Sequence, residues 1–197
     1  MKGSFLHIVL CIALFFCQSF HIHDDPSDGL YLAAKSKLIG ILEMIPEGEE
    51  GKYGFNNREE FKNAGLGVLY QEYSLETGQP TGYWRIPVTV DGEYRVILRY
   101  RKDTAGKWVW HGVSGTEIAR DLAILESNCE KHPATAIFIR DYELMCDFIL
   151  FNVKYNQPVT GDIIPLNISK RRLSALTGTD AKGRYSVEEI KKLHSGN

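Results

Sequence analysis

The sequence has few cysteines and lacks a long hydrophobic run in the body of the chain. It contains 4 cysteines in 197 residues, and Cys11 and Cys17 lie in or beside the first apolar stretch. That stretch, from Phe5 to Phe16, has the length of a secretory h-region and is too short to span a bilayer comfortably. No later run is apolar enough for a membrane helix, so we expect no transmembrane segment after signal removal.

The common signatures of cofactor and metal sites are also missing. The chain has no phosphate-binding loop and no dinucleotide-binding glycine fingerprint, and none of its 6 histidines falls in a metalloprotease helix pattern. We therefore expect no cofactor and no metal. The net charge of −2 argues against a general nucleic-acid binder, so we expect no nucleic-acid partner.

The N-terminal residues predict export. Lys2 precedes the apolar stretch, and Cys17-Gln18-Ser19 places small residues where signal peptidase reads them. We predict a signal peptide over residues 1–19 and a secreted or periplasmic protein. A lipid anchor on Cys17 is the alternative, although the bulky pair Phe15-Phe16 does not suit lipoprotein processing.

Export favours a disulfide between the two remaining cysteines, Cys129 and Cys146. The bridge would close a loop of about 17 residues, which chain-entropy estimates value at roughly 3 kcal/mol. The alternative is a metal site formed by Cys129, His132 and Cys146, which offers no clear fourth ligand. The polar run HIHDD at 21–25 could hold a metal loosely, but a solvated terminus explains it better.

Hydrophobic periodicity predicts an α+β fold, with helices packed on one face of an antiparallel meander sheet. We expect a flexible lead-in over 20–29, an α+β domain over 30–168 and a C-terminal helical extension over 169–197. The hydrophobic content of 44% is sufficient for a core.

Individual segments follow from local signals. A helix should end at Pro46, and an edge strand should contain Pro165. Two apolar runs should pair as a second hairpin, and the tail should form two helices. The expected ranges are 134–140 and 144–153 for the hairpin, and 169–176 and 187–194 for the helices.

The turn at Asp91-Gly92 allows a register argument. A two-residue loop would pair Val90 with Glu93 and would mix apolar and charged side chains on both faces. A three-residue loop with a bulge at Gly92 pairs Thr89 with Glu93 and separates the two kinds. We predict the second register, with a core face and an arginine-rich face. The arginines of that face are Arg85, Arg95, Arg99 and Arg101.

Two tryptophans follow on the next predicted strand. A tight turn in DTAG (103–106) would place Arg101 opposite Trp108 and Arg99 opposite Trp110, where cation–π contacts would form. Such a ladder suits an anionic, glycan or protein ligand. The alternative places both tryptophans in the core and leaves the arginines solvated. The candidate ligand-binding residues are Arg85, Arg95, Arg99, Arg101, Trp108 and Trp110.

Ser114 is a candidate nucleophile because it follows Gly112 just before a helical pattern. The hydrolase elbow Gly-x-Ser-x-Gly needs a second glycine, which is missing here. Ser114 and Glu117 instead have the spacing of a capping box. We predict that Ser114 begins a helix and is not catalytic, and that Ser186 and Glu189 form a second capping box.

Three stretches, "YGFNNREEFKNAGLG", "IPVTVDGEYRVIL" and "KWVWHGVSGTEIA", resemble uncharacterised secreted bacterial proteins. The chain is also loosely similar to small α+β modules with a cystatin-like or PepSY-like layout, in which a helix packs on an antiparallel sheet. That resemblance implies binding or inhibition of peptidases, or a role as a peptidase pro-region. It covers Tyr53 to Glu126, and it identifies no functional residue.

These observations predict an exported, non-enzymatic binding module at the cell envelope or outside the cell. Its partner would be a protein or an anionic or glycan polymer. One alternative is a small secreted hydrolase that uses Ser114, or a cysteine with His111 as base. Another is a peptidase inhibitor or pro-region-like module. The surroundings of Ser114 discriminate between them, because an enzyme needs a base near the hydroxyl.

Overall fold

The computed structural model describes residues 26–128, 135–153 and 155–194. The predicted signal peptide and Cys17 lie outside these ranges. The described helices are α2 (Pro26–Leu42), α3 (Thr116–Ser127), α4 (Asn167–Thr177) and α5 (Val187–His194), with the short 3-10 helices η1 (Glu50–Tyr53) and η2 (Arg58–Asn63). The strands are β1 (Gly65–Leu66), β2 (Tyr70–Ser74), β3 (Pro80–Val90), β4 (Glu93–Lys102), β5 (Trp108–Ser114), β6 (Ala136–Asp141), β7 (Cys146–Phe151), β8 (Asp162–Pro165) and β9 (Tyr185–Ser186).

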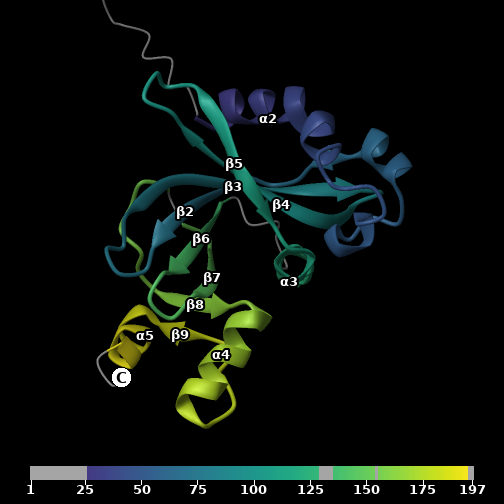
Figure 1. Ribbon diagram of the computed structural model, residues 1–197. Helices are drawn as coiled ribbons and strands as arrows, with labels where there is room; N and C mark the ends of the chain where they lie inside the picture. Colours follow the sequence, from purple (N-terminus) through teal and green to yellow (C-terminus); the bar gives the residue numbers. More distant parts are fainter. Residues whose placement is uncertain (1–25, 129–134, 154, 195–197) are drawn as a thin grey trace, which may run out of the picture.

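The fold is α+β with a mostly antiparallel open sheet, which confirms the predicted class. The strand order is β5-β4-β3-β2-β6-β7-β8-β9, and β1 pairs with β3. The sheet consists of two antiparallel meanders that meet where β2 and β6 pair in parallel. The chain between these two strands makes a long excursion through β3, β4, β5 and α3 (Figure 1). Local patterning did not indicate this parallel joint.

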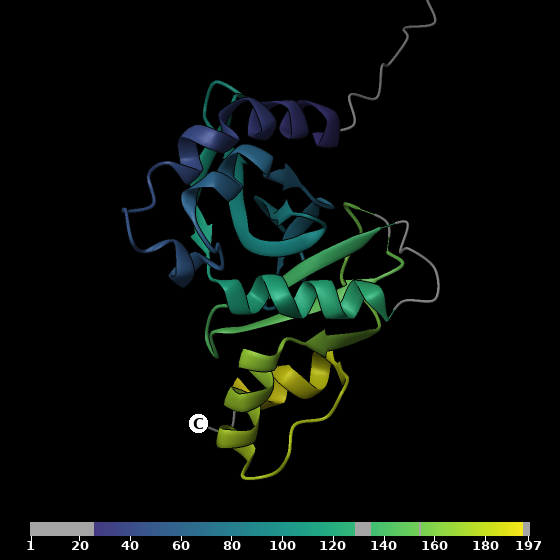
Figure 2. The same ribbon diagram turned by 90° about the vertical axis from the view of Figure 1, so that its right-hand side faces the viewer.

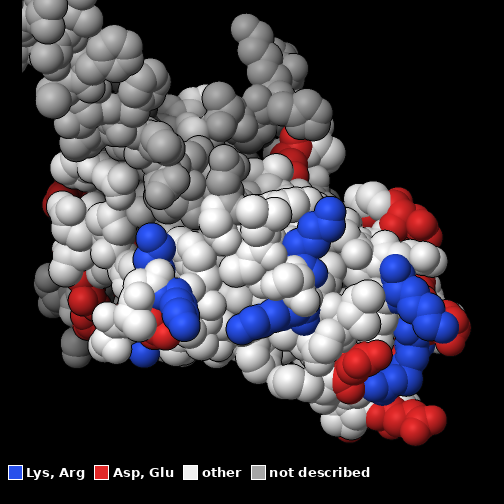
Figure 3. All heavy atoms as spheres, turned by 90° about the horizontal axis from the view of Figure 1, so that it is seen from above, with Lys and Arg blue, Asp and Glu red and all other residues white. Residues whose placement is uncertain are grey.

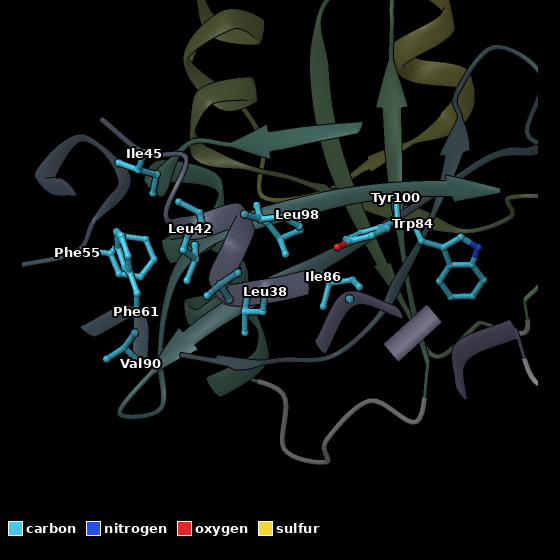
Figure 4. Close-up of a cluster of buried hydrophobic side chains, with 14 of the residues drawn as sticks. Leu38, Leu42, Ile45, Phe55, Phe61, Trp84, Ile86, Val90, Leu98 and Tyr100 are labelled. Atoms are coloured by element: carbon cyan, nitrogen blue, oxygen red, sulfur yellow. The ribbon is translucent and has the colours of Figure 1, made fainter. Parts of the chain in front are cut away.

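Helices cover both faces of the sheet, whereas we expected them on one. α2 contributes Leu38 and Leu42 to a core with Ile86 and Leu98 (Figure 4). Ile97, the neighbour of Leu98 in β4, belongs to a second cluster that includes residues of α3. Successive strand residues point to opposite faces, so α2 and α3 lie on opposite sides. Figure 2 shows α2 above the strands β3 and β4 and α3 below them.

The turn between β3 and β4 differs from our prediction. Val90 pairs directly with Glu93, so the loop has two residues. Both loop residues have positive φ, 52° at Asp91 and 81° at Gly92, as a type I′ turn requires. The bulge lies in β4, where the register shifts between the partners of Thr89 and Val88.

The extra residue in that bulge is Arg95, because Thr89 pairs with Tyr94 while Val88 pairs with Val96. The inserted residue restores the register from Val96 onward. The core face is therefore largely as predicted, with Trp84, Ile86, Val88, Val96, Leu98 and Tyr100 all buried. Tyr94 is an exception and packs with the α3 cluster.

The C-terminal part follows the predicted elements closely. β6 and β7 form the second hairpin, and α4 and α5 are present. The strand that contains Pro165 is β8, but it lies between β7 and β9 and is not the predicted edge strand. Pro165 is tolerated there because β9 pairs only with Asp162 and Ile163. Leu173 of α4 and Ile190 of α5 share a core with Phe148 of β7. The capping box of α5 is confirmed: the amide of Ser186 donates to Glu189 at 2.8 Å, and the amide of Glu189 donates to Ser186 Oγ at 3.2 Å. Within the described ranges, no helix is long and apolar enough to cross a membrane.

Candidate ligand-binding surface

A buried glutamate on β2 organises the arginines of β3 and β4. The side chain of Glu72 is fully buried. Arg85 Nε donates to Glu72 Oε2 at 2.7 Å, and Arg99 Nη2 donates to Glu72 Oε1 at 2.7 Å. The hydroxyl of Tyr142, in the β6–β7 turn, donates to the same Oε1 at 2.8 Å. One carboxylate thus holds two guanidinium groups from adjacent strands.

These partners keep Glu72 ionised. Burial alone would raise the pKa of Glu72, but Arg85, Arg99 and Tyr142 hold that pKa below its ordinary value. Arg85 is itself 1% exposed, and its guanidinium carbon lies 3.8 Å from the centroid of the Phe138 ring. Arg85 therefore supports the surface from beneath and cannot contact a ligand in solvent.

Arg99 and Arg101 extend from this buried pair towards solvent. The guanidinium carbon of Arg99 lies 3.5 Å from the centroid of the Tyr83 ring. Arg101 Nη1 donates to the Tyr83 hydroxyl at 3.2 Å, and Arg101 Nε donates to His111 Nε2 at 2.8 Å. We call Tyr83, Arg99, Arg101, His111 and Tyr142 the arginine surface.

The arginine surface has positive charge in excess. Arg99 shares Glu72 with Arg85, and among the described residues Arg101 has no carboxylate partner within ion-pair distance. Partial burial together with the charges of Arg101 and Arg99 lowers the pKa of His111. A neutral imidazole is also what the bond from Arg101 requires, because only a deprotonated nitrogen accepts. An acidic group of a ligand at the arginine surface would therefore contact positive charge that no carboxylate balances, beside Tyr83 and Tyr142.

The tryptophans lie on the opposite face. Trp108 pairs with Lys102 and Trp110 with Tyr100, not with the two arginines. Both tryptophans pack against the core beneath α2. The predicted ladder of Arg and Trp is wrong, because the turn is longer than assumed and Lys102 therefore pairs with Trp108.

His111, the residue inserted at a bulge in β5, lies on the arginine surface. Arg99 pairs with Gly112 and Tyr100 with Trp110, so His111 is the inserted residue. Its ring makes an edge contact with Tyr83, with centroids 5.5 Å apart. No ligand role was predicted from the sequence for His111, Tyr83 or Tyr142. Gly112, at φ 146°, was the one local signal for a break in the strand.

Arg95 does not join the other arginines. As the bulged residue of β4, it is directed towards η2 and the turn. It contacts Glu93 at 2.7 Å and Glu60 at 3.5 Å, and its side chain is 15% exposed. Its charge is thus balanced by two neighbouring carboxylates.

Ser114 is neither a cap nor placed for nucleophilic attack. The N-cap of α3 is Gly115, which makes no side-chain cap bond, so the predicted capping box is wrong. The helix begins one residue later than expected, and Ser114 ends β5 with its hydroxyl accepting from Arg85 Nη1 at 3.3 Å. Glu117 pairs with Arg171 instead. A guanidinium cannot remove a proton from a hydroxyl, as general-base activation requires.

Cys146 is buried and has no disulfide partner among the described residues. Burial, together with the charge of Asp141, raises its pKa to about 11, so it is protonated at neutral pH and a poor nucleophile. Cys129 and His132 lie outside the described residues, as does the HIHDD run, so the disulfide stays a prediction. Within the described part of the chain, no group of His, Cys, Asp and Glu could hold a metal ion.

The α2 side of the molecule differs in charge from the arginine surface. Figure 3 shows lysines and arginines interspersed there with acidic groups, most densely over the end that carries η1 and η2. Lys52 pairs with Glu49, and Lys62 pairs with Glu59.

Comparisons with known proteins add no assignment: no family model, curated protein or solved structure matches the chain.

Proposed function

We propose that the protein is an exported, non-enzymatic binding module that recognises an acidic partner through the arginine surface. The observation that carries the proposal is the pair of adjacent cations, Arg99 and Arg101, of which Arg101 lacks a carboxylate partner in the described chain. Glu72 and Tyr142 hold Arg99 in place, so less side-chain freedom is lost on binding. Export itself rests on the N-terminal residues alone.

The surroundings of the candidate nucleophiles and of His111 favour binding over hydrolysis. Ser114 is hydrogen-bonded to a cation, and Cys146 is a buried thiol with a raised pKa. The imidazole of His111 already accepts from Arg101. Guanidinium groups recognise carboxylates with directional hydrogen bonds, and Tyr83 and Tyr142 are the amphipathic side chains common at binding surfaces.

The test uses the full mature chain and labelled poly-L-glutamate at neutral pH. We expect binding that weakens steeply with added salt, because the charges are partly exposed. Arg101→Gln should weaken it about fivefold, the size of one exposed charge contact. Arg101 has no ionic partner among the described residues that its loss would leave unpaired, so thermal stability should stay near that of the wild type.

The matched control is Arg184→Gln. Arg184 is also exposed and lies in the C-terminal part of the chain, so its replacement removes the same charge elsewhere. Equal weakening by both variants would mean a general charge effect and would contradict the proposed surface. Heparin in place of polyglutamate distinguishes an anionic glycan from an acidic polypeptide.

A further inference from the structure

The arginine surface lies beside an open edge of the sheet. β5 is the terminal strand, and no described strand pairs with its outer side. An unpaired strand edge presents backbone N–H and C=O groups with which an extended peptide can pair. β5 thus has the geometry for addition of a strand from another molecule.

An apolar pocket lies beside this edge, on the face that carries α2. It has a volume of about 150 Å³ and lies between the end of α2, Tyr53 of η1, and Trp110 and Val113 of β5. Cavities of about this volume in protein cores bind benzene, so the pocket has room for one Leu or Phe side chain. Met44, which lines it, is 59% exposed, so the pocket reaches the surface.

Trp110 adds a donor at this place. Its Nε1 is buried and has no hydrogen-bond partner in the described chain. Burying an N–H without a partner is costly, and this indole lies on the α2 face together with the other residues that line the pocket. The free edge is therefore the observation that points to a backbone arriving at β5, and the pocket lined by Trp110 is a separate observation that points to an apolar side chain.

Neighbouring residues of β5 face opposite sides. Trp110 and Val113 pack in the cluster beneath α2, while His111 contacts Arg101 on the arginine surface. Side chains of a strand added beside β5 would alternate in the same way. One set would face the apolar pocket, and the other set would face Arg101 and His111.

We propose that β5 accepts an extended peptide in which acidic and apolar residues alternate. An apolar side chain enters the pocket, and the flanking carboxylates approach the arginine surface. This inference rests on the proposed function and specifies its ligand. A second copy of the chain is a poorer occupant, because pairing two β5 edges would bring two arginine surfaces together and like charges repel.

The probe is a short acetylated peptide in which Glu alternates with Val around one central Leu. Its control is an isomer of the same composition with the glutamates in one block. We expect the alternating peptide to bind the full mature chain about tenfold tighter, from the added pocket contact and backbone pairing. Hydrogen exchange at the amides of β5 should slow only with the alternating peptide. A version N-methylated at alternate amides, which cannot complete the ladder, should lose the gain.

Val113→Phe fills the pocket from within the chain. We expect it to reduce binding of the alternating peptide about tenfold and to leave polyglutamate binding unchanged. Val68→Phe is the matched control, since Val68 is 47% exposed and does not line the pocket. The N-methylated peptide tests the same inference without altering the protein.

The outcomes separate the two proposals. Equal binding of the two peptide isomers would overturn strand addition. If Arg101→Gln still weakened polyglutamate binding, the proposed arginine surface would be supported. If Arg101→Gln leaves the affinity for the alternating peptide unchanged, this result would overturn the role of the arginines. A concentration-dependent dimer that Val113→Phe abolishes would assign the edge to a second copy and overturn the peptide.

Discussion

Glu126 joins the last turn of α3 to the sheet through two tyrosines. The hydroxyl of Tyr94 donates to one carboxylate oxygen at 2.7 Å, and the hydroxyl of Tyr70 donates to the other. Burial raises the pKa of Glu126 to about 7, against an ordinary value of 4.5. Between these two pH values the folded chain retains a proton that the unfolded chain releases.

The stability of the protein should therefore depend on pH at this residue. A raised carboxyl pKa means that the folded state binds more protons, so the free energy of unfolding falls as pH rises from 4.5 to about 7. Glu126→Gln removes this titration. We expect the wild type to lose stability relative to the variant across that interval, as measured by urea unfolding at a series of pH values. A constant difference would mean that the two tyrosine donors keep the carboxylate ionised.

The pair of Arg85 and Glu72 is the second prediction at this scale. Arg85→Met leaves a fully buried carboxylate with only Arg99, Tyr142 and Thr81 as polar partners. Breaking a buried pair from one side costs about 3 to 5 kcal/mol, so we expect a large fall in the free energy of unfolding. The double variant Glu72→Met/Arg85→Met should recover part of this loss. A cost below about 1 kcal/mol for Arg85→Met would show that Arg99 alone neutralises Glu72.

Ser114 and Ser186 have the same spacing to a glutamate, but only Ser186 caps a helix. Ser186 and Glu189 cap α5 from both sides, whereas Ser114 contacts Arg85 and leaves α3 uncapped by a side chain. We expect Ser186→Ala to lower the free energy of unfolding by about 1 kcal/mol, as loss of a helix cap does. Ser114→Ala should cost clearly less in the same denaturation experiment, and an equal cost would contradict the assignment.

Strands were easier to predict than their turns. Alternation along Trp84, Ile86 and Val88 identified the buried face of β3, because burial acts on every second residue. It could not place the bulges, since one inserted residue restores the same alternation wherever it lies. The bulge was predicted at Gly92 and lies at Arg95. The assumed turn after Lys102 was too short, and this error put the tryptophans on the wrong face.

Only part of the candidate site could be predicted from the sequence. Arg99 and Arg101 were recognised, because they lie two residues apart on one strand. Glu72 was not, since it comes from β2, and Tyr142 comes from the β6–β7 turn. Only the tertiary fold brings these two residues to the arginines. A single sequence contains no local signal for contacts between such distant segments.

At the scale of the whole molecule, the parallel pairing of β2 and β6 has a consequence for the order of folding. Gln71 pairs with Ile137, so this joint closes across the entire excursion of β3, β4, β5 and α3. The hairpin of β3 and β4 closes over two residues. Loop closure over many residues is slower and must be compensated by later contacts, so the two meanders should form before they join.

Folding kinetics would show this order directly. Val96→Ala, inside the first hairpin, should slow folding, while Ile137→Val, at the joint, should cost about 1 kcal/mol and act mainly by speeding unfolding. Stopped-flow measurements over a range of denaturant separate the two effects. If Ile137→Val slowed folding as much as it destabilised the protein, the joint would form early instead. A joint that closes last is also the first to open, so the lifetime of the native state would depend on a single pair of strands.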